Sequence, residues 1–70
     1  MTEDKKFFFN GQEYSSNNNF SLFDLLKYFN YSLDLIVLEY NNLICKKEDW
    51  KNIIVKDKSK IEIITIVGGG

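Results

Sequence analysis

One segment of this chain has the apolar spacing of a helix, which limits the fold to a sheet that a single helix can cover. Four apolar residues recur at i, i+3, i+4 and i+7 and share one helical face: Leu22, Leu25, Leu26 and Phe29. Ser21 stands three residues before Asp24, a pairing typical of a helix start because each residue satisfies a free N–H of the other. Asn30 ends the run, since asparagine tolerates the left-handed cap conformation.

The rest of the chain predicts strands. Residues 5–9 and about 12–15 flank Asn10-Gly11, a strong hairpin signal because both central turn positions need positive φ. Residues 35–40 and 43–45 flank a second turn at Asn41-Asn42, and residues 60–67 form the last strand. Residues 46–50 predict a turn or a single helical turn that buries Trp50. The predicted fold is α+β: a mixed sheet of four to five strands with one main helix across one face.

A single helix leaves the other face of the sheet uncovered. Successive side chains of a strand alternate between faces, so Phe8 points away from the helix if Phe7 and Phe9 face it. On the last strand, Ile64 and Ile66 point the same way as Phe8. We expect Phe8, Ile64 and Ile66 to form an apolar docking patch, the alternative being partial burial beneath the end of the chain.

Composition excludes several classes of function. The net charge is −1 and the pI about 5.2, which argues against a nucleic-acid partner. There is no histidine and one cysteine, so the usual neutral-pH general base and His/Cys metal sites are missing. No phosphate-binding glycine motif precedes the helix, and no apolar stretch is long enough to span a bilayer. We therefore expect a soluble, intracellular protein, a monomer when free, that binds no metal or cofactor and is not an enzyme.

Residue usage also indicates an origin. Lys, Asn, Ile, Phe and Tyr number 9, 8, 8, 6 and 4, which is half of the chain, and Ala, Arg, His and Pro do not occur. The codons of the five abundant types are mostly rich in A and T. This predicts an AT-rich genome, either a plastid, with the protein in the stroma, or a low-GC bacterium, with the protein in the cytoplasm.

The chain ends in three glycines, residues 68–70, and two readings are open. Terminal glycines are often merely frayed. Alternatively, the carboxylate of Gly70 is the working group, because Gly68 and Gly69 lack Cβ atoms and can pass through a narrow channel. We expect residues 1–67 to form one domain and residues 68–70 a flexible tail.

Several stretches together resemble one family over about residues 7–70: FNGQEY, SLFDLLKYF, VLEYNNLICKKEDW and KIEIITIVGGG. The family is the ThiS-type sulfur carrier of thiamine biosynthesis, with a ubiquitin-like β-grasp fold. The most specific elements are Leu38-Glu39-x-Asn41 followed at this distance by Trp50, and the terminal Val67-Gly68-Gly69-Gly70. The chain departs from the family in turns, with Asn41-Asn42 for Asn-Gly, Lys46-Lys47 for Pro-Arg and Lys58-Ser59 for Gly-Asp.

The resemblance implies a carrier that serves as a protein co-substrate. A ThiF-type adenylating enzyme would use ATP to activate the Gly70 carboxylate, and a sulfur donor such as a cysteine desulfurase would convert the adenylate to a thiocarboxylate. ThiG-type thiazole synthase would then take the sulfur. Gly68 and Gly69 would thread through the partner's active site.

Other interpretations remain beside this one. The chain could be the related small subunit of molybdopterin synthase, or a ubiquitin-like modifier or interaction module. Cys45 suits a small strand hydrophobe better than a sulfur relay. Trp50 suits packing, and the lysines at 56, 58 and 60 suit a solvated turn.

Overall fold

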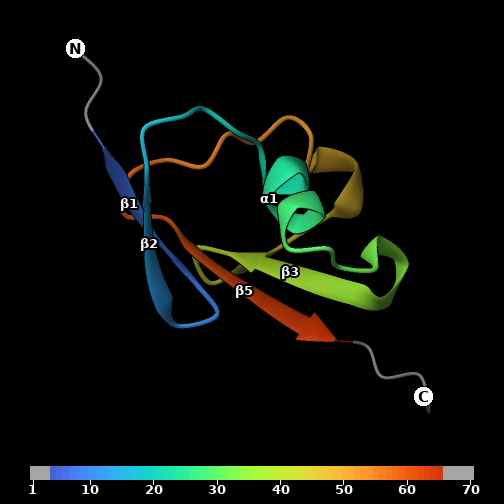
Figure 1. Cartoon of the computed structure of the whole chain (residues 1–70). Coiled ribbons are helices and arrows are strands. Elements are labelled where there is room, and N and C mark those ends of the chain that lie inside the picture. The colour runs from blue at the N-terminus through green and yellow to red at the C-terminus, as the bar shows by residue number, and fades with distance from the viewer. Residues whose placement is uncertain (1–3, 66–70) are drawn as a thin grey trace.

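The computed structural model describes residues 4–65 and consists of one sheet with one α-helix across one face (Figure 1). The sheet order is β2-β1-β5-β3-β4. Only β1 and β5 run parallel to each other, and the other neighbouring pairs are antiparallel. The strands are β1 (Lys5–Phe9), β2 (Gln12–Ser16), β3 (Ile36–Tyr40), β4 (Leu43–Cys45) and β5 (Lys60–Thr65). This arrangement confirms the predicted mixed sheet, and it has five strands.

The helix α1 (Leu22–Tyr28) begins and ends where the sequence predicts. The Ser21 hydroxyl accepts the Asp24 N–H, and the Asp24 carboxylate accepts the Ser21 N–H. At the other end Asn30 has a φ of 63°, and its N–H and that of Tyr31 donate to the last turn of the helix. Both termini therefore satisfy backbone groups that a short helix would otherwise leave free.

Segment 50–55 holds the start of α1 against the sheet. The N–H of Leu22 donates to the Ile53 carbonyl, and the N–H of Phe23 donates to the Trp50 carbonyl. Trp50 follows a 3-10 turn, η2 (Lys47–Asp49), and is buried, with its indole N–H donating to the Cys45 carbonyl at 3.0 Å. The single helical turn and the packing role expected for Trp50 are confirmed.

The core lies between α1 and the sheet face that it covers. Its buried members come from every layer of the fold: Phe7, Phe9, Leu22, Leu25, Leu26, Ile36, Leu38, Trp50, Val55 and Ile61. Because strand side chains alternate, the same strands present Phe8 and Ile64 on the uncovered face, as expected. A second 3-10 turn, η1 (Leu33–Leu35), precedes β3, so this strand begins at Ile36, one residue later than predicted. The described part of β5 ends at Thr65, and the predicted domain boundary after residue 67 lies outside the described residues.

Candidate functional site

The predicted working groups follow the central strand. β5 lies between β1 and β3, and its last described residue, Thr65, pairs with Ile36 at the start of β3 (Figure 1). Gly68, Gly69, Gly70 and Ile66 lie outside the described residues. The structure thus gives the strand that leads toward the chain end, and this strand is fixed to neighbours on both sides.

The uncovered face of the sheet carries the rest of the candidate site. Phe8 is 41% exposed and Ile64 is 48% exposed, and both lie on this face. Strand register nevertheless separates them, because Phe8 aligns with Lys60, four residues before Ile64 and about 13 Å along the strand. Phe8 and Ile64 are therefore two separate apolar positions on one face. Glu62 lies on the same face of β5, between Ile64 and Lys60, the residue that aligns with Phe8.

Two further apolar side chains on this face were not singled out from the sequence. Val37 stands directly opposite Ile64 across the β3–β5 pair. Ile44 on β4 is 70% exposed and stands opposite Glu39. The Asn41-Asn42 turn could have predicted the position of Ile44, since a two-residue turn fixes the register of its hairpin. No turn joins β3 to β5, so their register cannot be read from a local signal.

An acidic pair interrupts the apolar positions. Glu39 and Glu62 stand directly opposite each other in the β3–β5 pair. Like charges at opposed positions destabilise a sheet, so this pair costs the fold some stability. We define the docking face as Phe8, Val37, Glu39, Ile44, Glu62 and Ile64, all of which lie on the side of the sheet away from α1.

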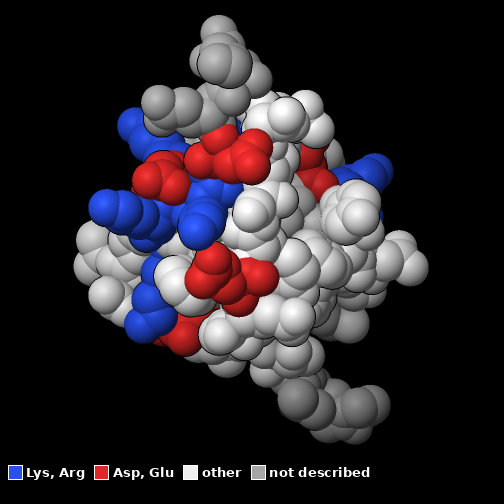
Figure 2. All heavy atoms as spheres, turned by 60° about the vertical axis from the view of Figure 1, so that its left-hand side comes forward, with Lys and Arg blue, Asp and Glu red and all other residues white. Residues whose placement is uncertain are grey.

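Charges of both signs lie interspersed on the face of the molecule drawn in Figure 2, beside a broad uncharged area. The lysines at 56, 58 and 60 are all exposed, and the Lys60 ammonium donates to the Asn42 side chain. Lys47 forms an exposed ion pair with Asp34 and lowers the pKa of that carboxyl. Exposed pairs of this kind add little to stability.

Cys45 points toward the covered face, opposite Leu38, and packs partly against the core. Partial burial raises the pKa of its thiol, and the nearby Asp49 carboxylate raises it further. A thiol in such surroundings is mostly protonated at neutral pH, which suits a packing role better than a sulfur relay.

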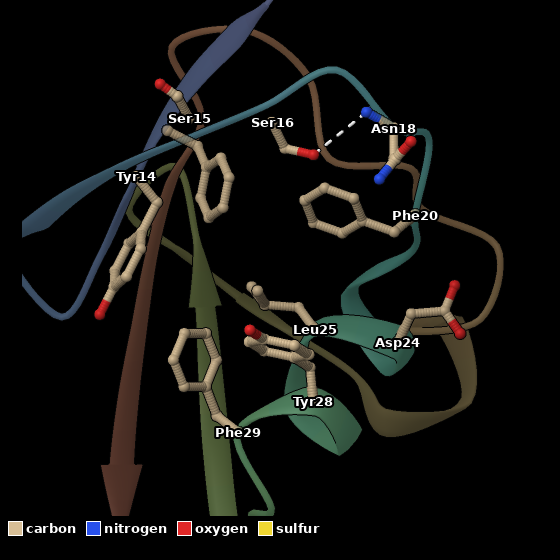
Figure 3. A pocket seen from close by; sticks show the side chains of 10 residues that line it. Tyr14, Ser15, Ser16, Asn18, Phe20, Asp24, Leu25, Tyr28 and Phe29 are labelled. Carbon is tan, nitrogen blue, oxygen red and sulfur yellow. Dashed lines mark hydrogen bonds between the residues drawn. The ribbon is translucent and has the colours of Figure 1, made fainter.

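A pocket lies elsewhere, between β2, α1 and the loop joining them (Figure 3). It has a volume of about 410 Å³, and aromatic rings make up much of its wall: Phe7, Tyr14, Phe20, Tyr28 and Phe29. Its one carboxylate, Asp24, already caps α1. Within residues 4–65, no three His, Cys, Asp or Glu side chains gather as a metal site would require, and no helix is long and apolar enough to cross a membrane.

The fold defines the class of protein: a small ubiquitin-like β-grasp domain, with a hairpin, a crossing helix and a central last strand. Among solved structures, the thiamine biosynthesis protein ThiS of Geobacter metallireducens superposes with a TM-score of 0.78, covering 93% of this chain and 99% of that one at 20% identity. The ThiS family model matches residues 6–70, and the chain belongs to the ThiS family.

Relatives of similar length carry only a general description. The "uncharacterized protein ycf40" of Trieres chinensis is 56% identical over 66 residues, which is 94% of this chain and 90% of that protein. The protein of the same description from Porphyra purpurea is 34% identical over 61 residues, 87% of this chain and 86% of that one.

Proposed function

We propose that this protein is a sulfur carrier for the thiazole moiety of thiamine and that the Gly70 carboxylate is its reactive group. The observation that carries the proposal is the match to the ThiS family, which extends to Gly70 and so includes all three terminal glycines. The β-grasp fold supports it by ending in a strand held on both sides. The proposed compartment is the plastid, supported by the AT-rich residue usage and the ycf40 relatives in Trieres chinensis and Porphyra purpurea.

The chemistry requires no base from the carrier. A C-terminal carboxyl has an ordinary pKa of about 3.3–3.7, so it is ionised at neutral pH and can attack the α-phosphate of ATP. That attack, on a ThiF-type adenylating enzyme, forms an acyl-adenylate and releases pyrophosphate. Sulfide sulfur from a donor then displaces AMP and leaves a thiocarboxylate. Transfer of that sulfur to the substrate of thiazole synthase, in exchange for an oxygen atom from that substrate or from water, regenerates a carboxylate.

The body of the carrier supplies affinity in this scheme. Ordering three glycines on binding costs about 1–2 kcal/mol of backbone entropy each, so the tail is a poor source of binding energy. The docking face offers Phe8, Ile44 and Ile64 as exposed apolar contacts. The Glu39–Glu62 pair offers a negative centre that would complement basic side chains of a partner.

The test is intact-protein mass spectrometry. The chain is incubated with the adenylating enzyme, ATP, a cysteine desulfurase, cysteine and dithiothreitol, which reduces the desulfurase persulfide to the sulfide level. We expect a mass gain that matches replacement of one oxygen by sulfur. Deletion of Gly70 should abolish the gain, while circular dichroism shows the same fold. An unmodified terminus, under conditions that charge an established carrier of this family, would overturn the proposal.

Formation of the thiocarboxylate alone does not distinguish a carrier for thiamine synthesis from one for molybdopterin synthesis. The charged carrier is therefore offered to thiazole synthase and, in parallel, to the large subunit of molybdopterin synthase. We expect sulfur consumption with the first enzyme. Consumption with the second enzyme alone would assign the carrier to the molybdopterin branch instead.

A further inference from the structure

Two turn asparagines, Asn10 and Asn41, each hold β5 with one backbone and one side-chain hydrogen bond. Asn10 and Asn41 each have a φ of 52° in the first position of a hairpin turn. The Asn41 N–H donates to the Lys60 carbonyl at 2.7 Å, and the Asn10 N–H donates to the Ile61 carbonyl at 2.9 Å. In return, the side-chain Oδ1 of Asn41 accepts the Lys60 N–H, and that of Asn10 accepts the Ile63 N–H, both at 2.8 Å.

The two clamps act at different points of the strand. Asn41 holds the first residue of β5, where β3 and β1 also lie alongside. Asn10 holds the fourth residue, beyond the end of the β1 pairing. β1 aligns with β5 only at Phe8–Lys60 and Phe9–Ile61, and the chain then turns away. The side-chain Oδ1 of Asn10 thus takes the place of the missing strand and gives the Ile63 N–H the acceptor that it needs.

The amide of Asn10 is itself fixed. Its Nδ2 donates to the Tyr31 hydroxyl at 3.0 Å. The Tyr31 ring in turn meets the Phe9 ring edge to face, with centroids 5.8 Å apart. The bond to Ile63 is therefore anchored to the core through Tyr31, and it lies two residues before the last described residue of the strand.

We propose that Asn10 is a positioning residue for the chemistry at Gly70. Resting on the proposed function, the inference is that the side chain of Asn10 fixes the direction in which β5 leads toward the reactive carboxylate, while the docking face holds the partner. Ile63 lies in the last half of β5, so a change of strand direction there shifts Thr65, the last described residue from which the chain leads on. Misplacement of a reacting group by about 1 Å can cost 100-fold in rate.

The test compares matched variants. Asn10→Gly and Asn41→Gly each remove one side-chain clamp, and glycine suits the positive φ of both turns. Asn10→Asp keeps an acceptor for Ile63 and can accept a hydrogen bond from the Tyr31 hydroxyl. The readouts are kcat and KM for the carrier in ATP–pyrophosphate exchange by the adenylating enzyme, and hydrogen exchange at the Ile63 amide.

For Asn10→Gly we expect kcat to fall about tenfold, with KM changed less than about twofold because the docking face is untouched. Exchange at Ile63 should become about fivefold faster. Asn41→Gly should leave both kinetic constants near those of the natural chain, and Asn10→Asp should restore most of kcat.

Equal losses of kcat in Asn10→Gly and Asn41→Gly would overturn the positioning role and leave a structural one, with the proposed function intact. Unchanged exchange at Ile63 in Asn10→Gly would overturn the clamp itself. Failure of the natural chain to be adenylated would overturn the proposed function and the positioning role with it, and the exchange data would still measure the clamp.

Discussion

Lys58 has a φ of 67°, a backbone conformation that side chains with a Cβ seldom adopt. It stands in the turn before β5, where the resemblance to the ThiS family leads one to expect glycine. The conformation is held in place by neighbouring hydrogen bonds, among them that from the Ser59 N–H to the Lys56 carbonyl. The strain therefore comes from having a lysine at this position, and a residue without a Cβ could adopt the same turn without it.

We expect Lys58→Gly to stabilise the protein. The left-handed conformation costs an L-residue about 1–2 kcal/mol, and glycine returns part of that gain through its greater freedom when unfolded, so the net gain is about 0.5–1 kcal/mol. Urea unfolding monitored by Trp50 fluorescence measures it. Lys56→Gly, a change at an exposed lysine outside the positive-φ positions, should not stabilise. A loss of stability in Lys58→Gly would contradict the assignment of strain.

Cys45 gives a second prediction at this scale. Because burial and the Asp49 carboxylate raise the pKa of its thiol, less thiolate is present near pH 8 than in a free cysteine. Alkylation by iodoacetamide should therefore be slower than that of a model peptide. Asp49→Asn should lower the thiol pKa and speed the reaction. Alkylation at or above the peptide rate would revive the sulfur-relay interpretation.

At the scale of elements, the sequence predicted the features that depend on neighbouring residues, namely the ends of the helix and the hairpin turns. The Ser21–Asp24 pair and Asn30 bound the helix in both sequence and structure, and each of the two hairpin turns lies at its predicted dipeptide. The placement of Phe8 and Ile64 on one face also followed from alternation. What could not be predicted was the distance between them, because the β1–β5 and β3–β5 registers join segments far apart in the chain.

The side-chain hydrogen bonds of Asn10 and Asn41 to β5 could not be predicted from the sequence for a related reason. Asparagine in a hairpin turn is already explained by its positive φ, so nothing in the sequence indicates a second role. The acidic pair could not be predicted because Glu39 and Glu62 become neighbours only through the register between β3 and β5, which are far apart in the chain. The terminal glycines could be singled out because their signal is entirely local, and their role stays a prediction.

The acidic pair yields a prediction on stability. Glu62→Lys should replace a repulsion with an attraction to Glu39 and stabilise the fold by about 0.5–1 kcal/mol. Glu13→Lys, on the same face but opposite Phe8, is the control and should change stability by less than about 0.5 kcal/mol. If Glu62→Lys stabilises the fold and also raises KM for the adenylating enzyme, the pair is kept for binding. Equal stability of Glu62→Lys and the natural chain would show that the two carboxylates do not interact.

At the scale of the whole molecule, the two faces of the sheet have different environments. The covered face holds the core, and within residues 4–65 no helix lies across the other face. The aromatic pocket is lined by residues of β2, α1 and the loop joining them. In Figure 1 the β1–β2 hairpin lies on the opposite side of the fold from the end of β5. Changes on the uncovered face should therefore alter association without altering the fold.

Two exposed isoleucines test this separation. Ile64 on the docking face is 48% exposed, and Ile54, in the segment beside α1, is 42% exposed. We expect Ile64→Ser to weaken binding to the adenylating enzyme by at least about fivefold, a loss of about 1 kcal/mol, and Ile54→Ser to leave it unchanged. Isothermal titration calorimetry measures both affinities, and thermal unfolding reports any loss of stability. Equal affinities for the two variants would exclude this face from the interface.

The central position of β5 also has a mechanical consequence. When an enzyme closes around the end of the chain, any pull passes into the strand between β1 and β3. Force along its axis meets the hydrogen bonds to β3 along the strand, and those near Lys60 and Ile61 on the β1 side, in shear rather than one at a time. If the end of the chain is handed between enzymes as proposed, we expect the domain to stay folded under that load.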